Sequence, residues 1–252
     1  MSVAIEYQMF IKKFTKSVET ELGDLVDSLV LVGSIASKTQ IDGESDVDFY
    51  LILDDSKFES VGGTLSAWTK VAKLVGTYLE NPLFVTMLDL TILVKAQVPK
   101  TGNCETGLNP IRVLNGVQGE TKLGTNPFEG LEIPDEIIQH GAKQMAGEYL
   151  DQLKDLCLMI GDIPPYEILY NAVDTVLGCA QAALYYHGER DISRCSAPEI
   201  LPKIFEGKFN NEVVLKAHHF RLAAEDISDE GDLKFIAEAA DFCHSVLKYV
   251  NE

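Results

Sequence analysis

Hydrophobic and polar positions alternate along one short stretch near the N-terminus. Between residues 46 and 53 the polar positions are Asp46, Asp48 and Tyr50, and the apolar positions between them are Val47, Phe49 and Leu51. Successive side chains of a strand point to opposite faces, so this pattern predicts a strand with its acids on one face. The apolar run 28–32 predicts a second, buried strand. Residues 33–45 are polar, contain two glycines, and are expected to form a loop.

Helical spacing of apolar residues flanks these strands. Residues 3–22 and 65–79 carry apolar side chains three or four positions apart, which predicts two amphipathic helices, the second with Trp68 buried. The apolar run 84–94 contains Asp89 as its one acid and predicts a further strand. Residues 111–114 predict another short strand, and Asn115-Gly116 is typical of a hairpin turn after it.

From Pro134 onward the pattern is helical throughout. Five helices are expected, at 137–160, 166–186, 197–205, 210–227 and 229–250. Together they indicate an antiparallel helical bundle. The long apolar helix 166–186 is compatible with a central place in this bundle or with the face of a homodimer. We therefore expect an α+β chain, with a mixed β-sheet flanked by helices in residues 1–133 and an α-helical bundle in residues 134–252.

Composition narrows the classes of partner. Apolar residues make up 46% of the 252 residues, enough for a sizeable core. The formal net charge is −18, which disfavours nucleic acid as a partner because phosphate binding needs clustered Lys and Arg. It is compatible with a small or cationic substrate, although solubility alone also explains an acidic surface.

Other features limit the compartment and the cofactors. No apolar run approaches the roughly 20 residues that span a bilayer, so no membrane partner is expected. The five cysteines form no C-x-x-C pair, which argues against a zinc ribbon. Their odd number, without a secretory signal pattern, is typical of the reducing cytoplasm.

The candidate chemistry lies around the alternating strand. Asp46 and Asp48 share a face and offer the oxygen ligands that a hard divalent cation prefers. Gly33-Ser34 ends the preceding strand, where a bare backbone and a hydroxyl could meet a phosphate chain. Asp89 lies inside an apolar run, where an unpaired buried charge is costly, so it needs a partner or a task. The alternative is that these are surface acids beside a turn.

These residues resemble a known motif. Gly33-Ser34, a loop, Ser45-Asp46-Val47-Asp48 in a strand and Asp89 in a later strand resemble the core of the polymerase-β-like nucleotidyltransferase superfamily. The order of a small mixed domain and a helical bundle resembles its small-molecule branch, the aminoglycoside nucleotidyltransferases. The chain departs from the pattern at Ser37-Lys38, where many members have a glycine.

The resemblance implies a reaction. Asp46 and Asp48 would hold Mg²⁺ against the β- and γ-phosphates of a nucleoside triphosphate, and Ser34 would hydrogen-bond a phosphate beside the bare backbone of Gly33. Asp89 would help to bind a second Mg²⁺ or orient the attacking hydroxyl. The enzyme would transfer a nucleoside monophosphate, AMP from ATP, to a hydroxyl of a small molecule such as an aminoglycoside. Residues 1–133 would be the catalytic domain and residues 134–252 the acceptor-binding domain.

Two other functions remain open. The first is transfer to a protein side chain, as in antitoxin-like minimal nucleotidyltransferases. The second is a nucleotide-binding or interaction module that keeps the fold without turnover, although the three aspartates argue against it. No spacing selects a general base for the acceptor among Glu148, Asp151 and Asp174.

Overall fold

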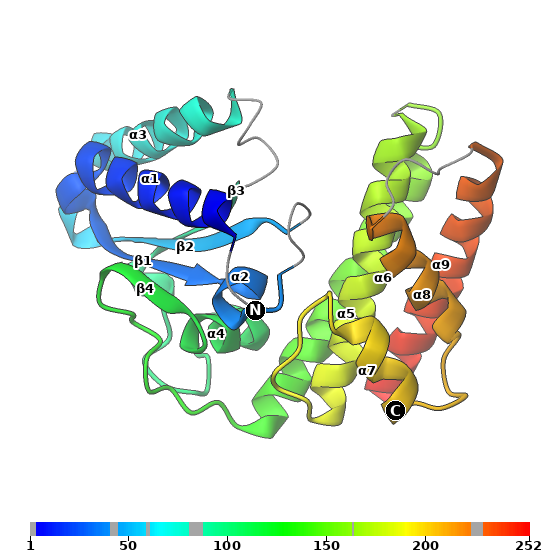
Figure 1. Ribbon diagram of the computed structural model, residues 1–252. Coiled ribbons are helices and arrows are strands. Elements are labelled where there is room, and N and C mark those ends of the chain that lie inside the picture. The colour runs from blue at the N-terminus through cyan, green and yellow to red at the C-terminus, as the bar shows by residue number, and fades with distance from the viewer. Residues whose placement is uncertain (1–3, 41–44, 59–60, 81–87, 163, 223–228) are drawn as a thin grey trace. The chain divides into compact units, whose positions relative to one another are not determined.

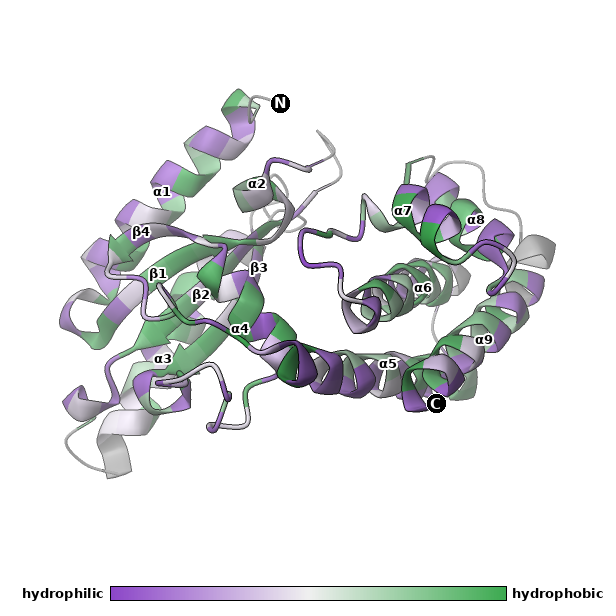
Figure 2. Ribbon diagram, turned by 90° about the horizontal axis from the view of Figure 1, so that it is seen from below, coloured by the Kyte–Doolittle hydropathy of each residue, from purple (hydrophilic) through white to green (hydrophobic). Residues whose placement is uncertain are grey.

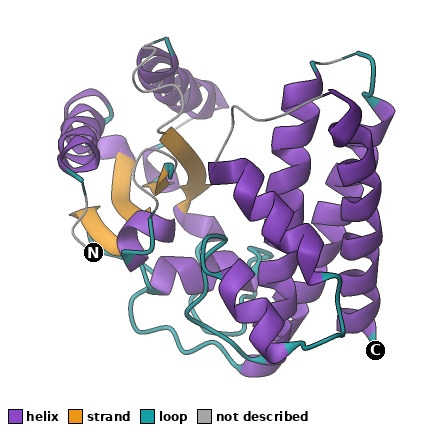
Figure 3. Ribbon diagram, turned by 45° about the vertical axis from the view of Figure 1, so that its right-hand side comes forward, coloured by secondary structure: helices purple, strands orange, loops and turns teal. Residues whose placement is uncertain are grey.

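The chain divides into two compact units. The computed structural model describes residues 4–40, 45–58, 61–80, 88–162, 164–222 and 229–252. The first unit comprises residues 1–108 and 112–133, and the second comprises residues 109–111 and 134–252. In the part of the chain that the structure describes, the strands belong to the first unit, whereas the second unit is built of helices and loops (Figure 3).

A four-stranded sheet forms the centre of the first unit. Its strands are β1 (Val26–Val32), β2 (Val47–Leu53), β3 (Leu88–Val94) and β4 (Glu120–Gly124). They lie in the order β3-β2-β1-β4. β1 is antiparallel to both β2 and β4, whereas β2 and β3 are parallel. The predicted mixed sheet is therefore confirmed.

Two helices, α1 (Ile5–Glu21) and α3 (Val61–Leu79), cover one face of this sheet (Figure 1). Phe14 of α1 packs on Phe49 of β2 with their ring centroids 5.0 Å apart, and Tyr78 of α3 meets Phe14 edge to face at 5.1 Å. Val47, Phe49 and Leu51 belong to this core. The alternation in β2 thus places its apolar positions as the sequence predicts.

The prediction of a buried Trp68 is wrong. Trp68 is 37% exposed, whereas the buried residues among the described side chains of α3 are Ala67, Val71, Leu74 and Tyr78. These four follow helical spacing, and Trp68 lies one position, about 100° around the helix, from that row. The helix was predicted correctly, but its apolar residues surround more of its circumference than the sheet can cover.

Residues 110–117 form a helix, so the predicted strand at 111–114 and the hairpin turn after it are wrong. Helix α4 (Pro110–Val117) begins with proline, and the Asn109 side chain accepts a hydrogen bond from the Ile111 amide at 2.9 Å. Phe128 packs between Gly116 of α4 and Tyr50 on the second face of the sheet. This layer covers the face opposite to α1 and α3 (Figure 1).

The second unit contains the five predicted helices, and the last residues predicted for the fourth, 223–227, lie outside the described residues. They are α5 (Asp135–Leu158), α6 (Pro165–His187), α7 (Ala197–Ile204), α8 (Asn211–Leu222) and α9 (Asp229–Asn251). α6 is the most hydrophobic of the three long helices of this unit, α5, α6 and α9 (Figure 2). It packs against α5, α7, α8 and α9, with Leu169, Leu177 and Leu184 fully buried. These apolar residues of α6 therefore pack inside the bundle.

A membrane span was not expected from the sequence. Among the residues that the structure describes, no helix is both long enough and apolar enough to cross a membrane.

Candidate functional site

The sheet brings two of the candidate acids side by side. β2 and β3 run parallel in a register that pairs Asp48 with Asp89. Neighbouring strands lie about 4.8 Å apart, and paired residues of adjacent strands point to the same face. Asp48 is half-buried, whereas Asp89 is exposed. The register thus places two carboxylates, distant in sequence, at one position of the sheet.

Asp46 lies just before the first residue of β2, two positions from Asp48, and is also half-buried. In extended backbone this spacing places both side chains on one face. Asp46 and Asp48 each interact with other groups of the chain, so neither carboxylate is without a partner.

The position of Asp89 corrects one part of the sequence argument. Asp89 lies near the start of β3, an edge strand of the sheet, and its side chain is exposed. Its charge is therefore solvated, and the cost of burying an unpaired carboxylate does not apply to it. Asp89 remains a candidate site residue because it pairs with Asp48 in the register of β2 and β3.

Gly33 lies against the carboxylate of Asp48. Val32 pairs with Asp48 across β1 and β2, and Gly33 follows with a left-handed φ of 70°. A Cβ placed on Gly33 would lie 2.1 Å from Asp48 Oδ2 and 2.7 Å from its Cγ. Glycine is therefore required here to leave room for the Asp48 side chain. The sequence argument invoked close approach of a triphosphate, but this steric reason lies within the chain itself.

A short helix occupies the start of the segment that was predicted as a loop. α2 (Gly33–Ser37) begins directly after β1. The Ser34 carbonyl oxygen accepts a hydrogen bond from the Thr39 amide at 2.9 Å. The Ser34 hydroxyl forms no hydrogen bond with another described residue. The predicted loop was wrong for residues 33–37, and residues 41–44 lie outside the described part of the chain.

Lys38 ends α2 in the left-handed conformation, with φ 60° and ψ 31°. This conformation is easy for glycine and costs other residues about 1 kcal/mol. Lys38 thus adopts a glycine-like backbone in the region where the resembling family often has a glycine. The departure in sequence leaves the local backbone turn intact.

The candidate aspartates fit one hard cation with a few protein ligands better than a site in which protein side chains supply every ligand. Aspartate oxygens are the ligands that Mg²⁺ prefers, and Asp48 has an acid beside it in β3 and another two positions earlier. Among the described residues, however, no group of three or more His, Cys, Asp or Glu side chains is gathered closely enough to hold a metal ion. Asp48 with one neighbouring carboxylate fits a single Mg²⁺ that keeps part of its water shell.

The second unit has a separate polar cluster that sequence reasoning did not assemble. Asp174 of α6 pairs with Arg194 at 2.5 Å and with Arg221 at 3.3 Å. Arg194 also donates to the Tyr149 hydroxyl at 2.7 Å, and burial raises the pKa of Tyr149. Because these residues come from separate elements, no spacing in the sequence indicates that they meet.

The ion pairs limit the choice of a general base in the second unit. Asp174 is held by two arginines, and Asp151 pairs with Lys154 at 2.7 Å. Arg190 pairs with Asp135 at 2.5 Å. The Asp174 pairs join α6 to Arg194 and to Arg221 of α8, whereas the Asp151–Lys154 pair is an exposed pair within α5.

Comparisons with known proteins agree with this architecture. No protein-family model matches the sequence, and no curated protein is significantly similar to it. Among solved structures, the chain is similar to the spectinomycin adenyltransferase AAD(9) from Enterococcus faecialis, whose crystal structure contains ATP and spectinomycin. The TM-score is 0.59 at 15% sequence identity, and the match covers 94% of this chain and 98% of that chain. The chain therefore has a nucleotidyltransferase-type fold, in which a mixed sheet flanked by helices is followed by an α-helical bundle.

Proposed function

We propose that this protein is a magnesium-dependent nucleotidyltransferase that moves a nucleoside monophosphate, AMP from ATP, to a hydroxyl of a small molecule. The observation that carries the proposal is the pairing of Asp48 with Asp89 beside a glycine that leaves room for the Asp48 carboxylate. The fold shared with a spectinomycin adenyltransferase supports it.

Each residue has a role that its chemistry suits. Asp46 and Asp48 would hold Mg²⁺, which neutralises phosphate charge when it is bound. Asp89 would orient the acceptor hydroxyl or add an oxygen ligand. The Ser34 hydroxyl would donate a hydrogen bond to a phosphate oxygen. Catalysis would rest mainly on positioning the hydroxyl in line with the phosphate.

The acceptor is proposed to be a small, cationic molecule, and the helical second unit is proposed to be the acceptor-binding domain. The net charge of −18 suits a cation. The adenyltransferase of similar fold was solved with spectinomycin, which makes aminoglycoside-like compounds the first acceptors to test.

The test follows a label from the triphosphate to its acceptor. The protein is incubated with Mg²⁺ and each α-labelled nucleoside triphosphate, against a panel of aminoglycosides including spectinomycin, and separately against cell lysate. We expect label on a small molecule with ATP, and loss of transfer in Asp48→Asn. The control is Asp24→Asn, which changes an exposed acid of the same unit.

Each of the other possible outcomes of this experiment leads to a different conclusion. Label on a protein would replace the small-molecule proposal with protein modification. No label on any acceptor, although the triphosphate binds, would indicate a nucleotide-binding module. Transfer that is unchanged in Asp48→Asn would contradict the assignment of the metal site.

A further inference from the structure

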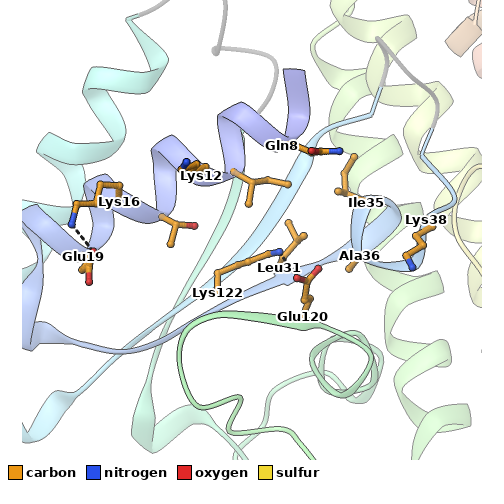
Figure 4. A pocket seen from close by; sticks show the side chains of 12 residues that line it. Gln8, Lys12, Lys16, Glu19, Leu31, Ile35, Ala36, Lys38, Glu120 and Lys122 are labelled. Atoms are coloured by element: carbon orange, nitrogen blue, oxygen red, sulfur yellow. Dashed lines mark hydrogen bonds and ion pairs between the residues drawn. The ribbon is translucent and has the colours of Figure 1, made fainter. Parts of the chain in front are cut away.

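A second candidate site lies on the α1 side of the sheet, within the first unit. A groove of about 790 Å³ runs between α1, the end of β1, α2 and the edge strand β4 (Figure 4). We call it the lysine groove, and its lining includes Lys12, Lys16, Lys38 and Lys122. Its volume is within the range of about 300–1,000 Å³ typical of small-molecule pockets.

The lysine groove has an aliphatic floor. Ile11, Leu31, Ile35 and Ala36 line it, and Leu31 and Ile35 are each only 2% exposed. Such a floor favours the apolar body of a ligand because burying both surfaces removes them from water. The Thr15 hydroxyl also lines the groove and is buried without a hydrogen-bond partner.

A β-bulge directs Lys122 into the lysine groove. Leu29 pairs with Leu123 and Val30 pairs with Thr121, so Lys122 is an extra residue between the two pairs. Bulges of this kind change the direction of a side chain and often lie beside functional sites. The Lys122 side chain is only 18% exposed, and its ammonium lies near Leu31 in Figure 4. A mostly buried ammonium over an apolar floor is a binding position for an anion.

The charge of the lysine groove is opposite to that of the whole chain. Four of the 21 basic residues line it with two acids, whereas the chain has 39 acids and a net charge of −18. Lys16 pairs with Glu19 at 2.8 Å, and Lys122 pairs with the exposed Glu120 at 2.6 Å. Lys12 and Lys38 form no ion pair with other described residues. The groove therefore keeps a local excess of positive charge.

We infer that the lysine groove binds a small organic anion, with its apolar body on Leu31 and Ile35 and its charged group on Lys122. In the absence of ligand the Lys122 ammonium pairs with the Glu120 carboxylate, and the bound anion replaces that carboxylate. This inference does not depend on the proposed nucleotidyl transfer. It rests on a different face of the sheet from Asp48.

A purely structural role for Lys122 makes different predictions. β4 is an edge strand, and an inward-pointing charge on an edge strand prevents pairing with another chain. In that case Lys122 would affect self-association but not the binding of any anion. An anionic probe and its neutral analogue separate the two possibilities.

The experiment titrates the full chain with 8-anilinonaphthalene-1-sulfonate and, in parallel, with N-phenyl-1-naphthylamine, which has the same rings without the sulfonate. We expect saturable binding of the anionic probe and much weaker binding of the neutral one. Lys122→Met keeps an apolar stem and should weaken anionic binding by about tenfold or more. Glu120→Gln removes the competing carboxylate and should strengthen it. Lys73→Met, an exposed lysine on α3, should leave it unchanged.

A steric variant tests the same site without changing charge. Ala36→Phe places a ring in the lysine groove and should abolish binding of the anionic probe, while thermal unfolding checks that each variant is folded. The inference is overturned if the native chain does not bind the anionic probe saturably. It is also overturned if folded Lys122→Met, or folded Ala36→Phe, binds the probe as the native chain does.

Discussion

At the scale of single residues, Gly33 and Asp48 form one steric unit. The Asp48 carboxylate occupies the space that any side chain on Gly33 would need. Asp46 and Asp48 could be predicted as a pair from alternation alone, because a strand has a period of two. The contact with Gly33 could not, because it depends on how β1 and β2 are paired.

Gly33→Ala is expected to destabilise the protein more than the same change at Gly130. Both glycines have a positive φ, 70° and 77°. The left-handed strain of alanine should therefore lower the free energy of unfolding of each variant by about 1 kcal/mol. Gly130 has nothing within 4 Å of its added Cβ, whereas Gly33 meets Asp48, which should cost about 1–3 kcal/mol more. Urea unfolding measures both, and equal losses at the two sites would contradict the steric role of Asp48.

Lys38→Gly should stabilise the protein, because glycine adopts the left-handed backbone of this residue without strain. The gain should be about 0.5–1 kcal/mol in the free energy of unfolding, since part of the relief is offset by chain entropy. Lys38→Ala removes the same charge but keeps the strain, so it should show no gain. A stabilisation shared by both variants would assign the effect to charge instead of the backbone.

At the scale of elements, periodicity predicted the long helices and the central strands but failed for residues 110–117. The segment Ile111–Leu114, with three apolar residues and Arg112, is too short to distinguish a strand from a helix by pattern. The signals that favour a helix, an Asn cap followed by a proline at the first helical position, were present at Asn109 and Pro110. Asn115-Gly116 pointed to a hairpin, but Gly116 serves instead to admit the ring of Phe128.

The packing of α5 on α6 gives an element-level prediction. Gly178 of α6 faces the Tyr149 ring of α5, and a Cβ added there would lie 2.2 Å from the ring. Gly178→Ala should therefore destabilise by about 1–3 kcal/mol, although alanine favours a helix. Gly147→Ala, where the new Cβ meets nothing within 4 Å, should stabilise by about 1 kcal/mol. Chemical unfolding of both variants would contradict this account if the two changes had the same sign.

At the scale of the whole molecule, the net charge of −18 dominates long-range electrostatics. Raising NaCl from 0.01 to 0.15 M shortens the Debye length from about 30 Å to about 8 Å and screens self-repulsion. We expect the thermal midpoint at pH 7 to rise over this range. Near pH 4.6, the isoelectric point of the sequence, the salt effect should largely vanish. A midpoint that falls with salt at pH 7 would show that attractive ion pairs outweigh the repulsion.

The division into a sheet-containing unit and a helical unit could be predicted because strand-like and helical patterns alternate before Pro134, whereas the pattern after Pro134 is helical throughout. The lysine groove could not, because its residues come from α1, α2 and β4 and meet only in the folded unit. The pairing of Asp48 with Asp89 lies between these cases, since the sequence indicated both acids but only the sheet register joins them.

The central claim is that Asp48 helps to hold a magnesium-bound nucleoside triphosphate. Calorimetric titration with α,β-methylene-ATP tests it most directly, because no acceptor is needed. We predict binding that requires Mg²⁺, is lost in EDTA, and weakens by about tenfold or more in Asp48→Asn but not in Asp24→Asn. Binding that is absent, that is indifferent to Mg²⁺, or that is equal in Asp48→Asn and the native chain would contradict the claim.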